Sequence, residues 1–457
     1  MSLDPADTSV CATFRSFAYT QIEDRRIRVS IRFTLTAFTI CASLSAATSG
    51  GSNVTFNKDV APILQKNCQS CHRPGEAAPM PLLTYKQVRP WASAIKEAVA
   101  LKKMPPWFAD PHYGKWSNDR SLSKSDIDTI ARWVDSGAPE GDAKDAPIPV
   151  KFLDGWNISK PDMVLEMPAD FQVPAAGTID YQYILVPGKF TEDKWVRMAE
   201  VRPGNRALVH HVIAYVRPPG SKWMKDAQAG VPFVPARGGE EGQREFLVGF
   251  APGVVPQIME PGQARLIKAG SDIIFQMHYT ANGKEGADRT RIGLVFATEP
   301  PKERIYTLAA ATSKFAIPAG DADYQVDSRF EFAHDARIVS FLPHMHLRGK
   351  DFEYRVKYPD GRVETILSVP HYSFSWQLSY FPAVDLVLPA GAVIECTAHY
   401  DNSANNPYNP DATKVVRNGD QSWEEMMIGF FDVAIDPQMD PKTLMPKRSK
   451  GGGPPAL

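Results

Sequence analysis

The chain has 457 residues, enough for about three domains of ordinary size. Lysine and arginine (51) balance aspartate and glutamate (52), so the formal net charge of −1 excludes the basic surplus that nucleic-acid partners require. A hydrophobic fraction of 43% excludes a disordered chain, and five cysteines are too few for a disulfide scaffold.

The N-terminal segment is typical of a secretory signal. Four arginines between positions 25 and 32 precede an apolar stretch that ends in small residues near Ala46. At about 15 residues the stretch is too short to span a bilayer comfortably. We therefore expect residues 1–48 to be a targeting segment, the protein to be periplasmic or otherwise exported, and the mature chain to have no membrane span. Cleavage near Ala46 would remove Cys11 and Cys41.

Residues 52–141 are predicted to form a small helical domain. Apolar residues recur at helical spacing in three stretches, and the last of these begins after Ser123, a residue type that caps helices, and ends at Gly137. Residues 142–150 are acidic and rich in proline, which is typical of a linker.

The pattern changes after residue 150 to short alternating apolar runs separated by Pro, Gly, Asn and Asp. Successive strands without helical periodicity between them are typical of antiparallel β-sandwiches. The region is too long for one sandwich, and the proline-rich residues 299–302 divide it into lobes 151–299 and 300–437. Residues 438–457 are predicted to be an irregular tail. The predicted fold is therefore a small all-α domain followed by two all-β sandwich domains.

The sequence Cys68-Gln69-Ser70-Cys71-His72 is a C-x-x-C-H motif, the covalent attachment site of a c-type haem. Its two thiols can bond to one edge of a porphyrin, and the adjacent His72 can bind the iron. A redox-active C-x-x-C would need a thioredoxin-like βαβ context, and a zinc site would need a second ligand pair nearby. Since neither accompanies the motif, we expect one haem c on Cys68, Cys71 and His72.

The sixth iron ligand is predicted to be Met104, on a stiff Pro-Pro loop before the last predicted helix. Met80 and His112 are the alternatives. Methionine ligation raises the reduction potential and suits electron transfer rather than oxygen binding. Residues 54–141 resemble a class I cytochrome c, which implies a small helical domain with one haem that carries one electron at a time.

Five of the ten histidines lie in three groupings within the β region: His210-His211, His278, and His344-x-His346. Residues two apart on a strand share a face, so His344 and His346 could bind one metal ion directly. The adjacent His210 and His211 can reach one ion only if their strand is bulged or ends there. Each grouping alone is also compatible with buried, hydrogen-bonded histidines.

The ordered set of these groupings, followed by Glu425-Met426, resembles the copper type II, ascorbate-dependent monooxygenases, the family of peptidylglycine and dopamine β-hydroxylating enzymes. The resemblance covers roughly residues 150–437, mostly as motifs and spacing. It implies two nine-stranded jelly-roll lobes with one copper each, which face each other across a solvent-filled cleft.

The resemblance also implies the ligands of each copper. The electron-storing copper of the first lobe would be bound by His210, His211 and His278. The catalytic, oxygen-activating copper of the second lobe would be bound by His344, His346 and Met426, with Met427 as the rival of Met426. Imidazole suits copper in both oxidation states, and a thioether favours Cu(I).

Three positions depart from the family. Peptide-processing members carry Arg, Asn and Tyr where this chain has Leu342, Ile428 and Phe430, so the residues that grip a peptide carboxylate are missing. We therefore expect a less polar small molecule as substrate rather than a peptide C-terminus. Cys396 has no partner cysteine at the family position, where Met427 stands, and is expected to be a free thiol.

The predicted function is that of an exported oxidoreductase with one haem c and two coppers. It would act as a monooxygenase that uses O₂ to hydroxylate a C–H bond of a small molecule, with electrons from ascorbate or a periplasmic redox carrier passing through the fused haem. The alternatives are an electron-carrying cytochrome with a non-catalytic copper-binding module, and a copper oxidase or peroxidase.

Overall fold

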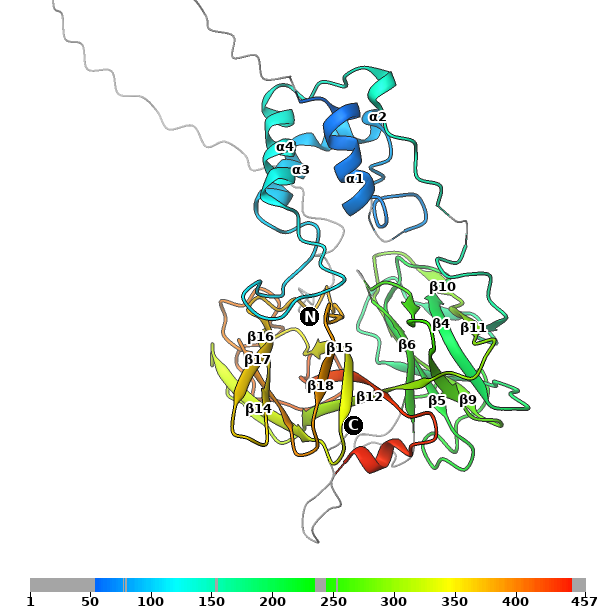
Figure 1. Ribbon diagram of the computed structural model, residues 1–457. Coiled ribbons are helices and arrows are strands. Elements are labelled where there is room, and N and C mark those ends of the chain that lie inside the picture. The colour runs from blue at the N-terminus through cyan, green and yellow to red at the C-terminus, as the bar shows by residue number, and fades with distance from the viewer. Residues whose placement is uncertain are drawn as a thin grey trace, which may run out of the picture.

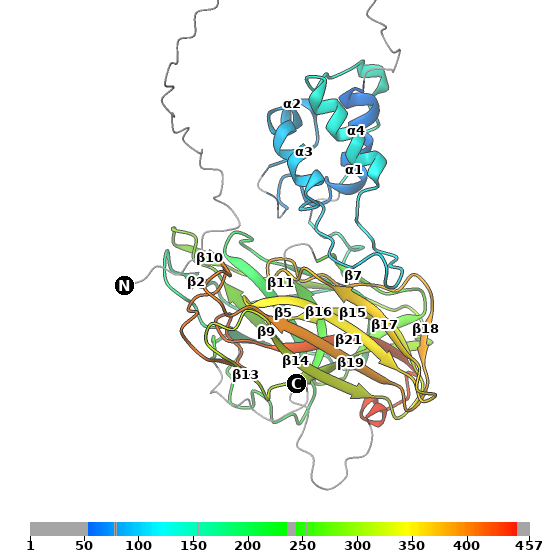
Figure 2. The ribbon, with the colours of Figure 1, turned by 90° about the vertical axis from the view of Figure 1, so that its left-hand side faces the viewer.

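The computed structural model describes residues 54–76, 78, 80–152, 155–234, 244–251 and 254–445. The predicted targeting segment, with Cys11 and Cys41, and residues 446–457 of the predicted tail lie outside this part of the chain. The described chain is mostly β-sheet, with α1 to α4 gathered at one end and a short helical turn, Pro441–Leu444, at the other (Figures 1 and 2). No helix in the described ranges is long and apolar enough to cross a membrane.

The helical region packs around buried Leu64, Ile130 and Trp133. Ser123 caps its longest helix, because the Ser123 side chain accepts a hydrogen bond from the N–H of Asp126. The helices are the π-helical turn Phe56–Val60, α1 (Ala61–Asn67), α2 (Tyr85–Val88), α3 (Ala92–Ala100) and α4 (Lys124–Asp135), with 3₁₀ turns at Arg89–Trp91, Ala143–Asp145 and Pro441–Leu444.

Two groups of strands follow, which we call the first lobe (163–296) and the second lobe (303–435). The strands of the first lobe are β1 (Met163–Glu166), β2 (Phe171–Val173), β3 (Gln182–Val186), β4 (Lys194–Arg202), β5 (Val209–Arg217), β6 (Glu245–Phe250), β7 (Gln257–Ile258), β8 (Gln263–Ile267), β9 (Asp272–Tyr279), β10 (Gly286–Asp288) and β11 (Arg291–Phe296). The strands of the second lobe are β12 (Glu303–Thr312), β13 (Ala316–Ile317), β14 (Tyr324–Glu331), β15 (Ala336–His344), β16 (Gly349–Lys357), β17 (Val363–Val369), β18 (Leu386–Leu388), β19 (Val393–Tyr400), β20 (Val416–Arg417) and β21 (Met427–Ile435).

Each lobe is a β-sandwich with its own hydrophobic core. One nine-stranded sheet runs through both lobes in the order β1-β11-β4-β8-β12-β21-β15-β18, with β7 beside β4. The sheet β3-β9-β5-β6 packs on it in the first lobe, and the sheet β14-β19-β16-β17 packs on it in the second. The apolar residues of the alternating runs therefore occupy the inward-facing positions of these sheets. The predicted β-sandwich architecture is confirmed.

The two lobes are joined through this shared sheet. Strands β8 and β12 pair in parallel at Gln263 and Glu303. Beside this contact, the guanidinium of Arg265 in the first lobe is 2.8 Å from the carboxylate of Asp432 in the second, and both side chains are almost entirely buried. The lobes are thereby held in one relative orientation, which places the ends of β5, β9, β15 and β21 close together.

The helical region also contacts the second lobe. Residues 107–119, which connect α3 to α4, extend onto the second lobe (Figure 1). The backbone N–H of Asp110 donates to the carbonyl of Ser368 over 2.8 Å, and the ring of Trp107 lies 5.0 Å from that of Tyr380. The apolar pattern does not predict this contact, because it depends on residues far apart in the sequence.

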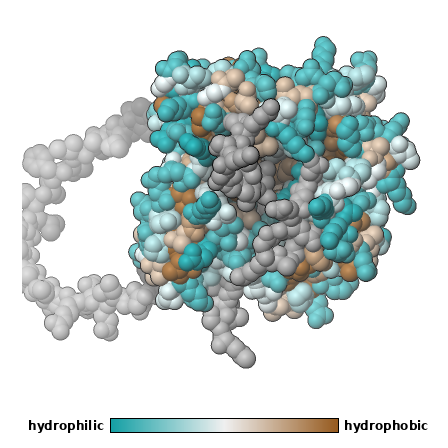
Figure 3. Space-filling model, turned by 90° about the horizontal axis from the view of Figure 1, so that it is seen from below, coloured by the Kyte–Doolittle hydropathy of each residue, from teal (hydrophilic) through white to brown (hydrophobic). Residues whose placement is uncertain are grey.

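The face of the β region that lies away from the helices carries mainly hydrophilic side chains, with hydrophobic residues scattered among them (Figure 3). Scattered apolar residues are normal on a protein surface and mark no interface. The histidine groups lie instead where the two lobes meet, and the C-x-x-C-H motif lies in the helical region.

Candidate metal centre

A β-bulge brings the two adjacent histidines of the first lobe to one side. Between β5 and β9 the register shifts at His210, so that Val209 pairs with Tyr279 and His211 pairs with His278. The extra residue is His210 itself. The irregularity that the His-His sequence requires for joint metal binding is therefore present in the strand.

The imidazoles of His210, His211 and His278 converge. Each offers a nitrogen that lies within 4.8 Å of those of the other two, and the Nδ1 atoms of His210 and His211 are 3.4 Å apart. The Nδ1 atom of His278 is buried and finds no hydrogen-bond partner in the described part of the chain. A buried ring nitrogen without a partner costs about 1–3 kcal/mol. Metal binding would satisfy it, so these residues fit a metal ion with three imidazole ligands.

The surroundings keep these imidazoles neutral. Burial lowers the pKa of His210 to about 4. Burial, together with the neighbouring histidines, lowers the pKa values of His211 and His278 well below the ordinary value. Neutral imidazole is the form that binds metal ions, so protons do not compete for these nitrogens near pH 7.

The second histidine pair lies where β15 ends. The rings of His344 and His346 are 5.2 Å apart and nearly perpendicular. The Nδ1 atom of His344 is 2.7 Å from Oε1 of Gln377, and that of His346 is 3.2 Å from the backbone carbonyl of Glu424. Because both oxygens only accept, each Nδ1 carries the proton, which leaves each Nε2 with a free lone pair. The Nε2 of His346 is buried and has no hydrogen-bond partner among the described residues.

The carboxylate of Glu425 fixes the turn that carries these histidines. It accepts hydrogen bonds from the backbone N–H groups of His346 (2.8 Å) and Arg348 (2.7 Å). Burial raises the pKa of Glu425 to about 8, although these N–H donors oppose the shift. Glu425 thus ties the end of β15 to the residue before β21, where the candidate methionine lies.

The strand register separates the two candidate methionines. His344 pairs with Ile428 across β15 and β21, and Met426, two residues before Ile428, continues the half-buried face of Ile428 in the alternation that leads into β21. Met427 points to the other face and is fully buried in the core of the second lobe. The geometry therefore favours Met426, rather than Met427, as the thioether beside His344 and His346.

The two histidine groups meet at the contact between the lobes. Phe374 of the second lobe stacks on His210 with 4.9 Å between ring centroids and lies 5.9 Å from His346. The hydroxyl of Ser422, also from the second lobe, is 3.4 Å from Nε2 of His278. The resemblance implies a solvent-filled cleft between the two sites. In this structure one aromatic side chain, Phe374, packs against an imidazole of each group, and His211 and His346 are buried, whereas His210, His278 and His344 are half-buried. The solvent-filled cleft stays a prediction of the resemblance.

The sequence does not predict several residues that contact the histidines. The ring of Tyr181 lies 5.0 Å from His211 and 4.7 Å from His278, and Gln377 orients His344. Tyr181 opens an alternating run that identifies a strand and gives no sign of a site. Phe374 and Gln377 lie in an irregular segment without periodicity, so only the tertiary structure places them.

The C-x-x-C-H motif lies at the end of α1, with Cys68 packed against the core of the helical region. The Nδ1 atom of His72 is 3.1 Å from the backbone carbonyl of Met80. Since this oxygen only accepts, Nδ1 carries the proton and Nε2 is free for a metal. Burial lowers the pKa of His72, which also favours the neutral, ligating form.

The same hydrogen bond distinguishes the candidates for a sixth iron ligand. The backbone carbonyl of Met80 accepts from Nδ1 of His72, so Met80 lies beside the ring nitrogen that would not bind the iron. His112 is exposed and its Nδ1 is 2.6 Å from the carboxylate of Asp110, on the segment that covers the second lobe. Met104 is partly buried just after α3, and neither of these observations applies to it.

Comparison with known proteins leaves the family open. No family model matches the chain, and no curated protein matches it. Among solved structures, PBCV-1 VP54, fitted into a reconstruction of the virophage Sputnik, is 8% identical, covering 62% of this chain and 96% of its own, with a TM-score of 0.22. PNGF-II is 9% identical, covering 60% and 64%, with a TM-score of 0.25. The VP2 subviral particle of infectious bursal disease virus is 11% identical, covering 64% and 76%, with a TM-score of 0.18. Likenesses this weak carry no inference about function.

Proposed function

We propose that this protein is an exported haem c and dicopper oxidoreductase, a monooxygenase that hydroxylates a C–H bond of a small molecule with O₂. The observation that carries the proposal is the convergence of five histidines, distant in the sequence, at one contact between the lobes. Two of their buried nitrogens have no hydrogen-bond partner in the described chain. Structural histidines would normally have their nitrogens satisfied.

Two copper sites follow from the donor sets. His210, His211 and His278 would hold one ion through three neutral imidazoles, and His344, His346 and Met426 would hold the other through two imidazoles and a thioether. Copper would supply one-electron redox chemistry and activation of O₂, and a haem on Cys68, Cys71 and His72, with Met104 as sixth ligand, would supply single electrons.

The residues around the two groups prepare them for this chemistry. Gln377 and the carbonyl of Glu424 hold the proton of each imidazole on Nδ1, so that Nε2 of both histidines is the metal-binding atom. Tyr181 and Phe374 pack against the imidazoles and exclude water from them. A dry site strengthens the electrostatic interactions within it and protects reactive oxygen species from side reactions.

An apolar surface continues the histidine face of the second lobe. Leu342 pairs with Phe430, and His344 pairs with Ile428, so these side chains share the face that carries His344. The rings of His344 and Phe430 are 6.1 Å apart. An apolar substrate resting on these residues would be held beside the second copper site, which supports a less polar substrate than a peptide C-terminus.

Turnover under ¹⁸O₂ tests the reaction type. Protein matured with haem and loaded with copper would be supplied with ascorbate and a panel of apolar small molecules. The proposal predicts one labelled oxygen atom in the organic product and the other in water. Appearance of all the label in water or hydrogen peroxide, with no labelled organic product, would instead identify an oxidase and contradict the proposal.

A further inference from the structure

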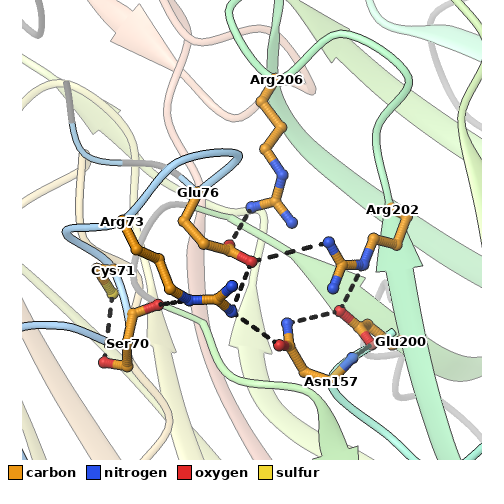
Figure 4. A network of polar contacts seen from close by, with 8 residues as sticks. All are labelled: Ser70, Cys71, Arg73, Glu76, Asn157, Glu200, Arg202 and Arg206. Carbon is orange, nitrogen blue, oxygen red and sulfur yellow. Dashed lines mark hydrogen bonds and ion pairs between the residues drawn. The ribbon is translucent and has the colours of Figure 1, made fainter. Parts of the chain in front are cut away.

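Glu76 connects the haem-attachment loop to the first lobe. Its carboxylate is 3.0 Å from a guanidinium nitrogen of Arg206 and 3.7 Å from one of Arg202, both in the first lobe. It is also 2.9 Å from the guanidinium of Arg73, in its own loop. The Glu76 side chain is only 9% exposed, so this is a buried ion cluster, not a surface salt bridge (Figure 4).

A second layer of polar contacts closes the network around this cluster. Arg73 donates to the side-chain oxygen of Asn157 over 3.0 Å. Asn157 donates from its side-chain amide to the carboxylate of Glu200 over 3.0 Å. The Nε of Arg202 is 2.9 Å from the same carboxylate. The loop that carries the motif is thus linked to β4 by two routes, one through Glu76 and one through Arg73 and Asn157 (Figure 4).

The cluster also lies between the two redox motifs along the chain. Glu76 is four residues after His72, and Arg206 is four residues before His210. The guanidinium of Arg206 lies over the ring of Phe250, 5.4 Å from its centroid, and Phe250 pairs with Val212, the residue after His211. The path from the C-x-x-C-H loop to the first histidine group therefore consists of one ion pair, one contact of a guanidinium with an aromatic ring, and one strand pairing.

Because the cluster is buried, it favours a single position of the haem-attachment loop on the first lobe. A buried carboxylate is stable only where its cations are in place, because displacement leaves a charge without compensation in a dry environment. The contact of residues 107–119 with the second lobe, by contrast, consists of hydrogen bonds between uncharged backbone and side-chain groups and of aromatic packing. Of these two contacts between described residues, the one at Glu76 contains several buried charges and includes Arg206, four residues before His210.

We propose that Glu76 is a positioning residue, which together with Arg202 and Arg206 holds the haem-attachment loop on the first lobe and so directs electrons to the group of His210, His211 and His278. In each transfer, a haem Fe(II) would be oxidised to Fe(III) and a Cu(II) at this group would be reduced to Cu(I), with no bond made or broken. This inference rests on the proposed function and deepens it, since it assigns the route by which electrons enter the copper centre.

The test uses the full chain with covalent haem and bound copper. A flash-generated flavin semiquinone reduces the haem, the haem absorbance follows its reoxidation, and loss of the Cu(II) resonance signal follows arrival of the electron. Glu76→Gln removes the charge and keeps the shape. Its matched control is Glu97→Gln, the same change at an exposed position on α3. Glu76→Asp keeps the charge and tests rescue.

We expect Glu76→Gln to slow electron transfer from haem to copper by about 30-fold, the effect typical of truncating one partner of a buried ion pair. Glu97→Gln should match wild type, and Glu76→Asp should recover part of the rate. The haem spectrum and reduction potential should be the same in all four proteins, because Glu76 acts on the position of the loop and not on the iron.

Amide hydrogen exchange on the copper-free protein provides a second readout that does not depend on electron transfer. Glu76→Gln should accelerate exchange in residues 70–76 and 200–206, and Glu97→Gln should not. If wild type holds both metals and passes no electron, the proposed function fails, and the electron route fails with it. If wild type passes electrons and Glu76→Gln does so equally fast, only the role of Glu76 is overturned.

Discussion

The phenyl ring of Phe374, in the second lobe, stacks on the imidazole of His210, in the first lobe, with 4.9 Å between centroids and an interplanar angle of 17°. The same ring lies 5.9 Å from His346. One side chain thus covers a candidate ligand of each group. The two groups therefore meet at a contact between the lobes, where His211 and His346 are buried.

Removing this ring should open the first histidine group to solvent. Phe374→Ala should accelerate the release of copper from His210, His211 and His278 to a competing chelator, because the apolar shell of a metal site controls solvent access. Phe430→Ala is a suitable control, since the ring of Phe430 lies beside His344 of the second group. Equal rates of copper release from the first site in wild type and Phe374→Ala would show that Phe374 does not protect it.

Gln377 should determine the affinity of the second site. Gln377→Leu removes the acceptor that holds the Nδ1 proton of His344, and loss of such a contact typically lowers metal affinity by about 10–100-fold. Gln377→Glu keeps an acceptor and should retain most of the affinity. Competition titrations with a copper chelator measure both. Unchanged affinity in Gln377→Leu would mean that the hydrogen bond does not orient a ligand.

The two adjacent methionines should behave differently when replaced. Met426→Ala should remove the sulfur contribution from the copper X-ray absorption spectrum and abolish turnover, with the haem spectrum and the first copper intact. Met427→Ala should keep the sulfur signal and destabilise the fold by about 2–5 kcal/mol, because it empties a buried core position. Loss of the sulfur signal in Met427→Ala alone would reverse the assignment.

Thiol counting distinguishes haem attachment from a free C-x-x-C pair. Burial in the core of the second lobe raises the pKa of Cys396 well above its ordinary value, so the native thiol should not react with iodoacetamide. After unfolding in denaturant, Cys396 should be the only reactive thiol of the haem-loaded mature protein. If Cys68 and Cys71 also react, they carry no thioether bonds and the haem assignment is wrong.

The sequence predicts the local features that follow from the spacing of residue types along the chain. The alternating runs identify the strands of both sandwiches. The requirement that His210 and His211 reach one ion predicts a strand that is bulged or ends there, and the structure has a bulge between β5 and β9. Ser123 likewise marks the start of α4. Each of these depends on residues close together in the chain, where spacing alone decides which side chains share a face.

The features that the sequence does not predict are contacts between distant segments. The parallel pairing of β8 with β12 makes one sheet of two lobes, and it has no signature in either strand alone. From the sequence alone, Glu76 would be expected to be a solvent-exposed acidic residue. Only the structure places the arginines of the first lobe around it. The same holds for Phe374, whose place against an imidazole of each histidine group depends on how one lobe packs on the other.

The most direct test of the account is elemental analysis of copper and iron per chain, on protein matured with haem, reconstituted with copper and then desalted. The account predicts two tightly held coppers for each iron, and a fall to one copper in His278→Ala, which removes a ligand of the first group only. One iron with no retained copper would contradict it, because the buried histidines would then be structural and the protein a cytochrome with a β-sandwich module.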